Sequence, residues 1–413
     1  LEKFNYAISA LIDVVQVLLL YLISYLLSKS HGISFFSALL YATSPILITQ
    51  NSNLNSRSLG ALIFTSTLLS LYAFISTSNY FYLFLTVILG ACLLLTHKLA
   101  TQQMVFLIAA FICLGVINFA VLAGIYLTAI FISGGFYLKT LKGHIAILKF
   151  WKKNILNLYA HQIYRSPIYK NTEKERTMRG CQGVASNKIW YFLAKLQFLL
   201  AIILVIYSYF KNRPHFALSD YFFVTWFIVN CVTIILTTYV KPLKFLGEGY
   251  RYYMYGIFPS SYLISRFGLD NGYSFCLFFI FILLVINISL ITKIHNDQKT
   301  NILASIDNNI KDMLAYIKQL PKDNIMCFPS TYCESIAYFC RKKTLWGGHG
   351  YCYDKLQDFF PVLLKPVEYF IEAFKISYCL INTAYVSLDD LSLKVNFKII
   401  KQIERYYLIE FLS

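Results

Sequence analysis

Ten long apolar segments occupy the first 294 residues of the chain and limit what it can fold into. A helix needs about 17–25 predominantly apolar residues to cross the hydrocarbon core of a bilayer. The candidate spans are residues 8–28, 33–49, 58–75, 80–96, 99–115, 119–136, 190–210, 221–240, 252–267 and 273–294. Backbone groups in lipid must find hydrogen-bond partners within the protein, so each segment is expected to be helical. The segments therefore predict an all-α polytopic transmembrane bundle with about ten spans.

The charge content supports lipid as the solvent of most of the chain. Only 14% of the 413 residues are Asp, Glu, Lys or Arg, whereas soluble domains carry about 25%. The formal net charge is nevertheless +17, which in a soluble protein would raise nucleic acid as a partner. No basic run is interleaved with stacking aromatics, so we expect the loop cations to anchor the spans and face anionic headgroups. The predicted partner is the lipid bilayer, with no nucleic acid.

The stretch 99–136 decides which connections share a side of the membrane. It is too long for one span at about 1.5 Å per residue, so we place a break near residues 115–118. Alternation of the spans then puts most unusual polar residues on one face. That face holds the N-terminus, residues 51–57, 96–98, 138–189 and 241–251, and the C-terminal domain.

The loop at residues 138–189 is the most basic segment, with eleven Lys and Arg residues against two Glu. Within it, residues 145–159 mix apolar and cationic side chains in the way that an interfacial amphipathic helix does. By the positive-inside rule, these charges alone would place this face on the cytoplasmic side.

The long apolar segments end before His295. From there on we predict a small soluble α/β domain. The expected domains are therefore residues 1–294 and 295–413. Strands are expected at 324–328, 344–346, 378–382 and 406–411, and helix at 301–320, 334–341 and most of 354–374. Alternation of strands and helices favours a largely parallel sheet. The glycine-rich stretch 346–350 follows a strand, but it lacks a phosphate-binding motif and is more typical of a turn.

Two polar positions near the first spans are candidate site residues. Asp13 lies inside the first span, where an ionisable group usually faces the interior of the bundle. It is a helper candidate for a polar site, or a hydrogen-bonded residue that locks two helices. Asn55 and Arg57 join the next two spans, and Arg57 can bind a phosphate with two parallel hydrogen bonds. The alternative there is a hydrated helix cap with an interfacial anchor.

Two further connections carry candidate residues on the same face. His97 and Lys98 can hold an anionic group or relay a proton, or they serve only as an anchor. Glu248 lies between two glycines, and Arg251 follows at the start of a span. Flexible backbone would let both side chains reach one cavity, whereas the simpler alternative is a local ion pair that caps a helix.

Four stretches, taken in order, resemble the GT-C class of membrane glycosyltransferases. They are Ala-Leu-Ile-Asp at 10–13, Ser-Ala-Leu-Leu-Tyr-Ala-Thr-Ser-Pro at 37–45, Asn-Ser-Arg-Ser-Leu-Gly at 55–60 and Gly-Glu-Gly-Tyr-Arg-Tyr at 247–252. The resemblance implies a polyprenyl-phosphate sugar donor and a glycan, lipid or protein acceptor. It implies donor-phosphate binding by a set of residues on the polar face, with Asp13 and Asn55 as helpers. That set is Arg57, His97, Lys98, Glu248, Arg251 and Tyr252.

The resemblance also bears on the catalytic carboxylate and on sidedness. The class carries its acidic motif in the loop after its first span, so we expect the catalytic residue upstream of Leu1 and the chain to be N-terminally truncated. A divalent metal is compatible with the class, but no ligand set is identifiable and the cofactor is unknown. The resemblance implies a prokaryotic plasma membrane with the C-terminal domain extracytoplasmic, against the charge count of residues 138–189.

Two other function classes fit the same residues. A transporter or flippase of a lipid-linked or anionic solute would use Pro45 and Pro259 to break spans and the cations to bind solute. A membrane glycan polymerase or ligase would transfer a whole oligosaccharide instead of one sugar. Uptake without glycosyl transfer would select the first alternative, and the mass of the product would select the second.

Overall fold

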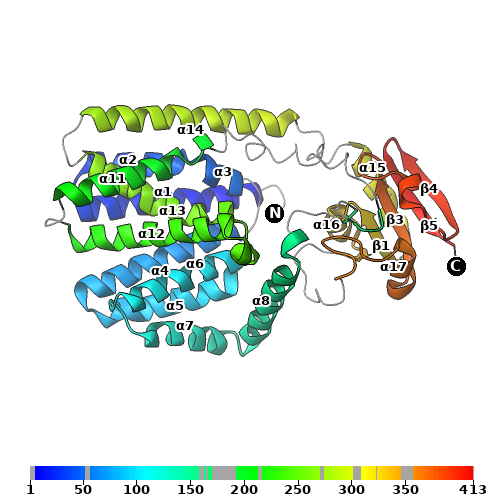
Figure 1. Cartoon of the computed structure of the whole chain (residues 1–413), viewed down its shortest axis with the longest axis horizontal. Coiled ribbons are helices and arrows are strands. Elements are labelled where there is room, and N and C mark those ends of the chain that lie inside the picture. Colours follow the sequence, from blue (N-terminus) through cyan, green and yellow to red (C-terminus); the bar gives the residue numbers. More distant parts are fainter. Residues whose placement is uncertain are drawn as a thin grey trace. The chain divides into compact units, whose positions relative to one another are not determined.

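The computed structural model describes residues 5–51, 56–157, 162–163, 166–169, 192–212, 216–269, 274–300, 308–321, 323–345 and 357–412 (Figure 1). The chain divides into two compact units. One contains Leu1–Ile145 and Asn187–His295, and the other contains Ala146–Ser186 and Asn296–Ser413. The division falls beside the expected boundary at residue 295, but it also groups part of the basic loop with the C-terminal unit.

The first unit is a bundle of helices that coincide with the ten apolar segments. Their bounds are α1 Asn5–Ser28, α2 His31–Ala42, α3 Pro45–Asn51, α4 Arg57–Thr77, α5 Tyr80–Thr96, α6 Lys98–Cys113, α7 Phe119–Ile132, α11 Leu196–Asn212, α12 Leu218–Tyr239, α13 Met254–Leu269 and α14 Ser274–Thr300. The segment expected at 33–49 is a pair of helices, α2 and α3, bent by 48° before Pro45. The break expected near residues 115–118 is present between α6 and α7.

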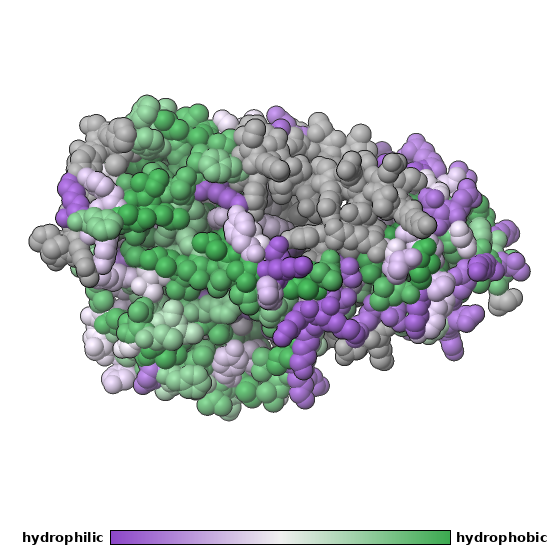
Figure 2. All heavy atoms as spheres, in the orientation of Figure 1, coloured by the Kyte–Doolittle hydropathy of each residue, from purple (hydrophilic) through white to green (hydrophobic). Residues whose placement is uncertain are grey.

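Length and composition support a membrane location for this unit. Among the described residues, four helices are long and apolar enough to cross a bilayer, and up to six if each bent pair is one span. Three shorter apolar helices, α5, α6 and α11, accompany them. Figure 2 shows apolar residues over the surface of these helices, as expected for contact with lipid tails. The fold class predicted for this part of the chain is confirmed.

Pro259 shapes the centre of the bundle. A proline inside a helix cannot donate to the carbonyl four residues earlier, which here belongs to Tyr255. The indole nitrogen of Trp226 donates to that carbonyl over 2.9 Å. The amide of Asn230 donates similarly to the carbonyl of Tyr252 over 2.9 Å. These buried bonds from α12 hold Tyr252 and the first turn of α13, so the carbonyl opened by Pro259 has a partner within the core.

The second unit contains a five-stranded sheet in the order β2-β1-β3-β5-β4. The strands are β1 Asn324–Phe328, β2 Lys343–Thr344, β3 Ile376–Asn382, β4 Phe397–Ile403 and β5 Tyr406–Phe411. Strands β2, β1 and β3 are parallel, whereas β5 is antiparallel to both β3 and β4. The described helices that accompany the sheet are α15 Asn308–Gln319, α16 Tyr332–Ser335, α17 Val367–Phe374 and α18 Leu388–Leu391, with the π-helical turn η7 Ile336–Cys340.

Two expectations for this unit are corrected. The sheet is mixed and not largely parallel, because a tight turn with Glu404 at φ 47° folds β4 back onto β5. Only Val367–Phe374 is helical in the described part of the stretch expected to be mostly helix at 354–374. Pro361 and Pro366 precede that helix, and proline disfavours helix in the residue before it. The glycine-rich stretch 346–350 lies outside the described residues.

Candidate functional site

Arg57 is held at the start of α4 by the end of α3. Its Nη1 donates to the side-chain oxygen of Gln50 over 2.7 Å and meets the carbonyl of the same residue at 3.5 Å. The side chain is half-buried. A neutral amide, that of Gln50, therefore helps to direct Arg57.

The loop between α12 and α13 presents the second arginine. It contains two 3₁₀ turns, η5 Lys241–Leu246 and η6 Gly249–Tyr252. Gly247 has φ 140°, a conformation that residues with a side chain rarely adopt. Gly249 is buried against α12, where a Cβ would lie 2.0 Å from the Thr238 hydroxyl and 2.9 Å from the Ile234 carbonyl. The glycines thus permit a fixed close approach to α12, whereas the sequence suggested flexibility.

Glu248 and Arg251 form an ion pair on this loop. The Nε of Arg251 lies 2.7 Å from a Glu248 carboxylate oxygen and donates to the Tyr250 hydroxyl over 3.2 Å. Burial alone would lower the pKa of Arg251, but Glu248 and Tyr250 outweigh it and raise that pKa. The local ion pair considered from the sequence is therefore present. Both side chains are 32% exposed, so the pair remains reachable by a ligand.

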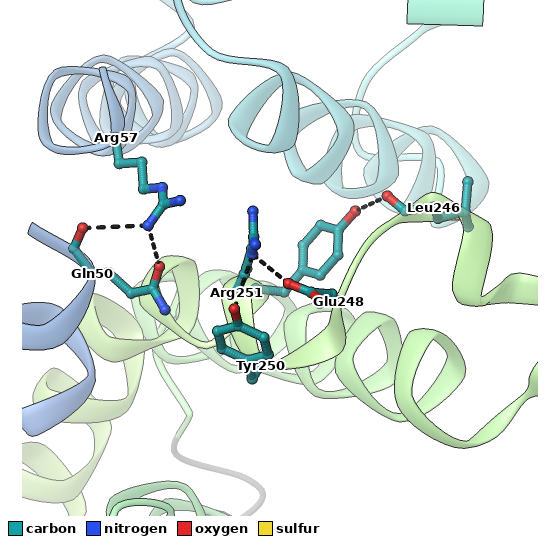
Figure 3. Close-up of polar contacts among 7 residues, drawn as sticks. Gln50, Arg57, Leu246, Glu248, Tyr250 and Arg251 are labelled. Carbon is teal, nitrogen blue, oxygen red and sulfur yellow. Dashed lines mark hydrogen bonds and ion pairs between the residues drawn. The ribbon is translucent and has the colours of Figure 1, made fainter. Parts of the chain in front are cut away.

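Arg57 and Arg251 face each other across this site. Each carries a positive charge, and Arg57 lies within electrostatic reach of Arg251, Tyr250, Tyr255 and Glu248. Figure 3 shows the guanidinium groups of Arg57 and Arg251 pointing into the same space, from α4 and from the loop before α13. Glu248 pairs with Arg251 on the side away from Arg57. We define Arg57, Glu248, Tyr250 and Arg251 as the arginine cluster.

Tyr252 lies behind this cluster and does not point into it. The residue is fully buried, and its hydroxyl donates to the Leu246 carbonyl over 2.9 Å, with Gln102 of α6 at 3.1 Å. A buried hydroxyl with these partners has no capacity for an anion. The expected phosphate contact by Tyr252 is therefore corrected to a supporting role, in which it ties the loop to α6.

His97 joins the same end of the bundle. It ends α5 and begins α6, where its Nδ1 meets the backbone amide of Ala100 at 3.4 Å. The Tyr255 hydroxyl lies 3.1 Å from the same nitrogen. Gly60 on α4 allows the approach, since a Cβ there would lie 2.7 Å from the Cβ of His97. His97 is thereby linked through Tyr255 to the surroundings of Arg57.

Lys98 and His144 extend the positive region. Lys98 is the half-buried first residue of α6. His144 belongs to α8 (Phe136–Lys153). Burial and the charge of Lys98 lower the pKa of His144 to about 4. His144 is therefore neutral at neutral pH, and Lys98 supplies the charge at this point.

Asp13 contacts α3 and has no ion pair with the described part of the arginine cluster. The side-chain amide of Asn51 donates to both of its carboxylate oxygens, at 2.9 and 3.0 Å. Nearby, the Tyr41 hydroxyl donates to Gln16 over 2.7 Å. This arrangement matches the helix-locking alternative for Asp13. Asn55 lies outside the described residues.

The described residues contain no group of three or more His, Cys, Asp or Glu side chains able to hold a metal ion. The arginine cluster instead combines two guanidiniums, one carboxylate and one phenol.

The solved structures that are similar to the chain include an oligosaccharyltransferase and ArnT, whereas no family model and no curated protein matches it. The oligosaccharyltransferase of Archaeoglobus fulgidus, in complex with Zn and sulfate, has a TM-score of 0.54 at 14% identity. The similarity covers 92% of this chain and 56% of that one, so this chain spans little more than half its length. ArnT from Cupriavidus metallidurans, in the apo state, has a TM-score of 0.50 at 10% identity over 98% of this chain and 83% of its own.

Both of these proteins are GT-C membrane glycosyltransferases. The chain has the GT-C fold. At this level of identity the similarity shows the fold alone, which agrees with the resemblance seen in the sequence. The roles of individual residues rest on the geometry of the site.

The sequence did not single out several residues of this site. Gln50, Tyr250 and Tyr255 contact the predicted arginines and histidine, and His144 lies near Lys98. Tyr250 and Tyr255 belong to an aromatic run at 250–255 that also serves as the start of a span. Their position four or fewer residues from Arg251 was the available signal.

Proposed function

We propose that the protein is an integral membrane glycosyltransferase that takes a sugar from a polyprenyl-phosphate donor and transfers it to a glycan, lipid or protein acceptor. The observation that carries this proposal is the convergence of Arg57 and Arg251 on one space in a chain with the GT-C fold. A phosphate between the two guanidiniums would relieve their repulsion. Arginine suits this role because its planar fork donates two parallel hydrogen bonds to phosphate oxygens.

The arginine cluster would also assist departure of the lipid phosphate. Negative charge grows on the phosphate as the bond to the sugar breaks, and fixed cations stabilise that charge without reorganisation. Glu248 holds Arg251 through an ion pair of 2.7 Å, which limits the movement of the guanidinium. His97 and Lys98 would add positive charge at the end of α5 and the start of α6.

The supporting residues have distinct proposed tasks. Tyr252 holds the loop to α6, and Gln50 directs Arg57. Asp13 would act as a helper only by fixing Asn51 and therefore the end of α3. The membrane is proposed to be a prokaryotic plasma membrane, with the second unit on the extracytoplasmic side.

The test is a glycosyl-transfer assay on the full natural protein reconstituted in lipid. A radiolabelled polyprenyl-phosphate hexose is supplied with membrane extract as acceptor, and labelled product is separated by mass. The proposal expects transfer of a single sugar and its loss in Arg251→Ala. Transfer of an oligosaccharide would favour the polymerase or ligase alternative, and solute uptake into vesicles without any labelled product would favour a transporter.

A further inference from the structure

Helix α8 is turned sharply from the preceding helix, α7. It follows α7 after Gly134 and Gly135, which have φ 56° and 82°, and its axis is turned by 118° from that of α7. A helix turned this far does not continue the span. The junction itself is apolar and exposed: Phe131 is 86% exposed and Phe136 is 57% exposed. The start of α8 is therefore continuous with surface of the kind that faces lipid.

The exposed face of α8 combines apolar and cationic side chains. Leu138, Lys142, Ile145, Lys149 and Lys152 are exposed and follow one another at spacings of three or four residues. Side chains at this spacing lie on one face of a helix. No acidic residue occurs in Phe136–Lys153. The face is thus a stripe of three lysines and two aliphatic residues.

The other face of α8 is covered by the protein. Tyr137 is fully buried, Phe150 is 5% exposed, and His144 and Trp151 are partly buried. The stripe is therefore the side of the helix that remains available to a partner, and its character is set by the lysines.

We propose that this stripe binds the headgroups of anionic phospholipids, with Lys142, Lys149 and Lys152 on the phosphates and Leu138 and Ile145 inserted between acyl chains. Amphipathic helices of this composition lie in the membrane interface. Lysine stems pack along apolar surface while the ammonium groups reach the headgroups. The continuity with the exposed apolar junction favours lipid over any soluble anionic partner. The inference needs only the membrane location and is independent of the reaction.

The test uses the whole protein in vesicles that contain phosphatidylcholine and traces of spin-labelled lipid. Electron paramagnetic resonance gives the fraction of labelled phosphatidylglycerol, and separately of labelled phosphatidylcholine, that is immobilised by the protein. Each lysine near an anionic surface contributes about 1 kcal/mol, or about fivefold in binding, at most. The parent is expected to immobilise phosphatidylglycerol preferentially, and K142Q/K149Q/K152Q is expected to lose at least about half of that preference.

The matched control is K311Q/K343Q/K398Q, which removes the same charge from exposed positions of the second unit. It is expected to retain the preference of the parent. Higher salt should weaken the preference in the parent and in the control. The inference is overturned if the parent shows no preference, or if the α8 variant, with an unchanged circular dichroism spectrum, keeps the full preference of the parent.

Discussion

The hydroxyl of Tyr255 lies 3.1 Å from Nδ1 of His97, and this contact joins the first turn of α13 to the connection between α5 and α6. The same turn is fixed from the other side, because Trp226 donates to the Tyr255 carbonyl. Tyr255 is therefore held by α12 through its carbonyl and contacts His97 through its hydroxyl. It is 2% exposed, so this role is one of positioning and not of contact with a ligand.

Tyr255→Phe tests this positioning role. The variant keeps the ring and removes only the hydroxyl, so the helix packing should survive while His97 loses a partner. A buried hydrogen bond contributes about 1 kcal/mol, and we expect kcat/KM for glycosyl transfer to fall about fivefold to tenfold. The double variant Tyr255→Phe/His97→Ala should be no slower than His97→Ala alone, because both changes remove one interaction. Fully additive losses would show that the two side chains act independently.

Arg251→Ala should reduce turnover by about a hundredfold or more, since it removes a fixed charge aimed at the leaving phosphate. Arg251→Lys should recover little of this activity, because a lysine cannot make the two parallel hydrogen bonds of a guanidinium. Lys241→Ala removes a cation from the same loop outside the arginine cluster and should retain normal activity. Activity of Arg251→Lys close to that of the parent would mean that only net charge is needed there.

Gly249→Ala should destabilise the protein without touching the arginines. A Cβ at this position would lie 2.9 Å from the backbone carbonyl of Ile234, which cannot move away easily. Such overpacking costs about 1–3 kcal/mol and should lower the thermal unfolding midpoint in detergent. Gly124→Ala is the control, since its nearest neighbours at 3.6 and 3.8 Å leave room for a methyl group. Equal midpoints for the two variants would contradict the close approach of the loop to α12.

His144 should make folding sensitive to acid. Its pKa is lowered from 6.5 to about 4 by burial and by Lys98. The unfolded chain therefore binds the proton more readily, and the stability contributed by neutral His144 is lost as the pH falls from about 6.5 toward 4. His144→Gln should show a smaller drop in unfolding midpoint between pH 7 and pH 5 than the parent. The exposed His295→Gln should follow the parent, and an unchanged pH dependence in His144→Gln would refute the assignment.

The sequence predicted the helices well because the membrane imposes a strong length and hydropathy rule on each of them. The break at residues 115–118 and the strand at 324–328 were both found from local composition. Strand β4 was missed because its residues Phe397–Ile403 alternate apolar and charged side chains irregularly, and its partner β5 decides its conformation. A local sequence pattern cannot predict contacts that arise only from tertiary packing.

The candidate site, too, was predictable only in part. Alternation of the spans predicted that Arg57, His97 and Arg251 lie at one end of the bundle. In the structure these residues are linked through Tyr255 and the arginine cluster. The direction of Tyr252 could not be predicted, because its hydroxyl contacts Gln102 of α6, which is 150 residues away in the sequence. The role of the glycines could not be predicted from the sequence either. Only the distance from Gly249 to α12 shows that a glycine is needed there for close packing.

Binding of a polyprenyl phosphate to the purified protein tests the central claim most directly, because it requires no acceptor and no turnover. Native mass spectrometry can compare a polyprenyl phosphate with the matching neutral polyprenol, which has the same chain and lacks the anion. The account predicts that the phosphate binds at least about tenfold more tightly to the parent, as a charge-assisted bidentate contact would provide, and that R57Q/R251Q loses this difference. Equal affinity of the parent for the two lipids would contradict a phosphate site between Arg57 and Arg251.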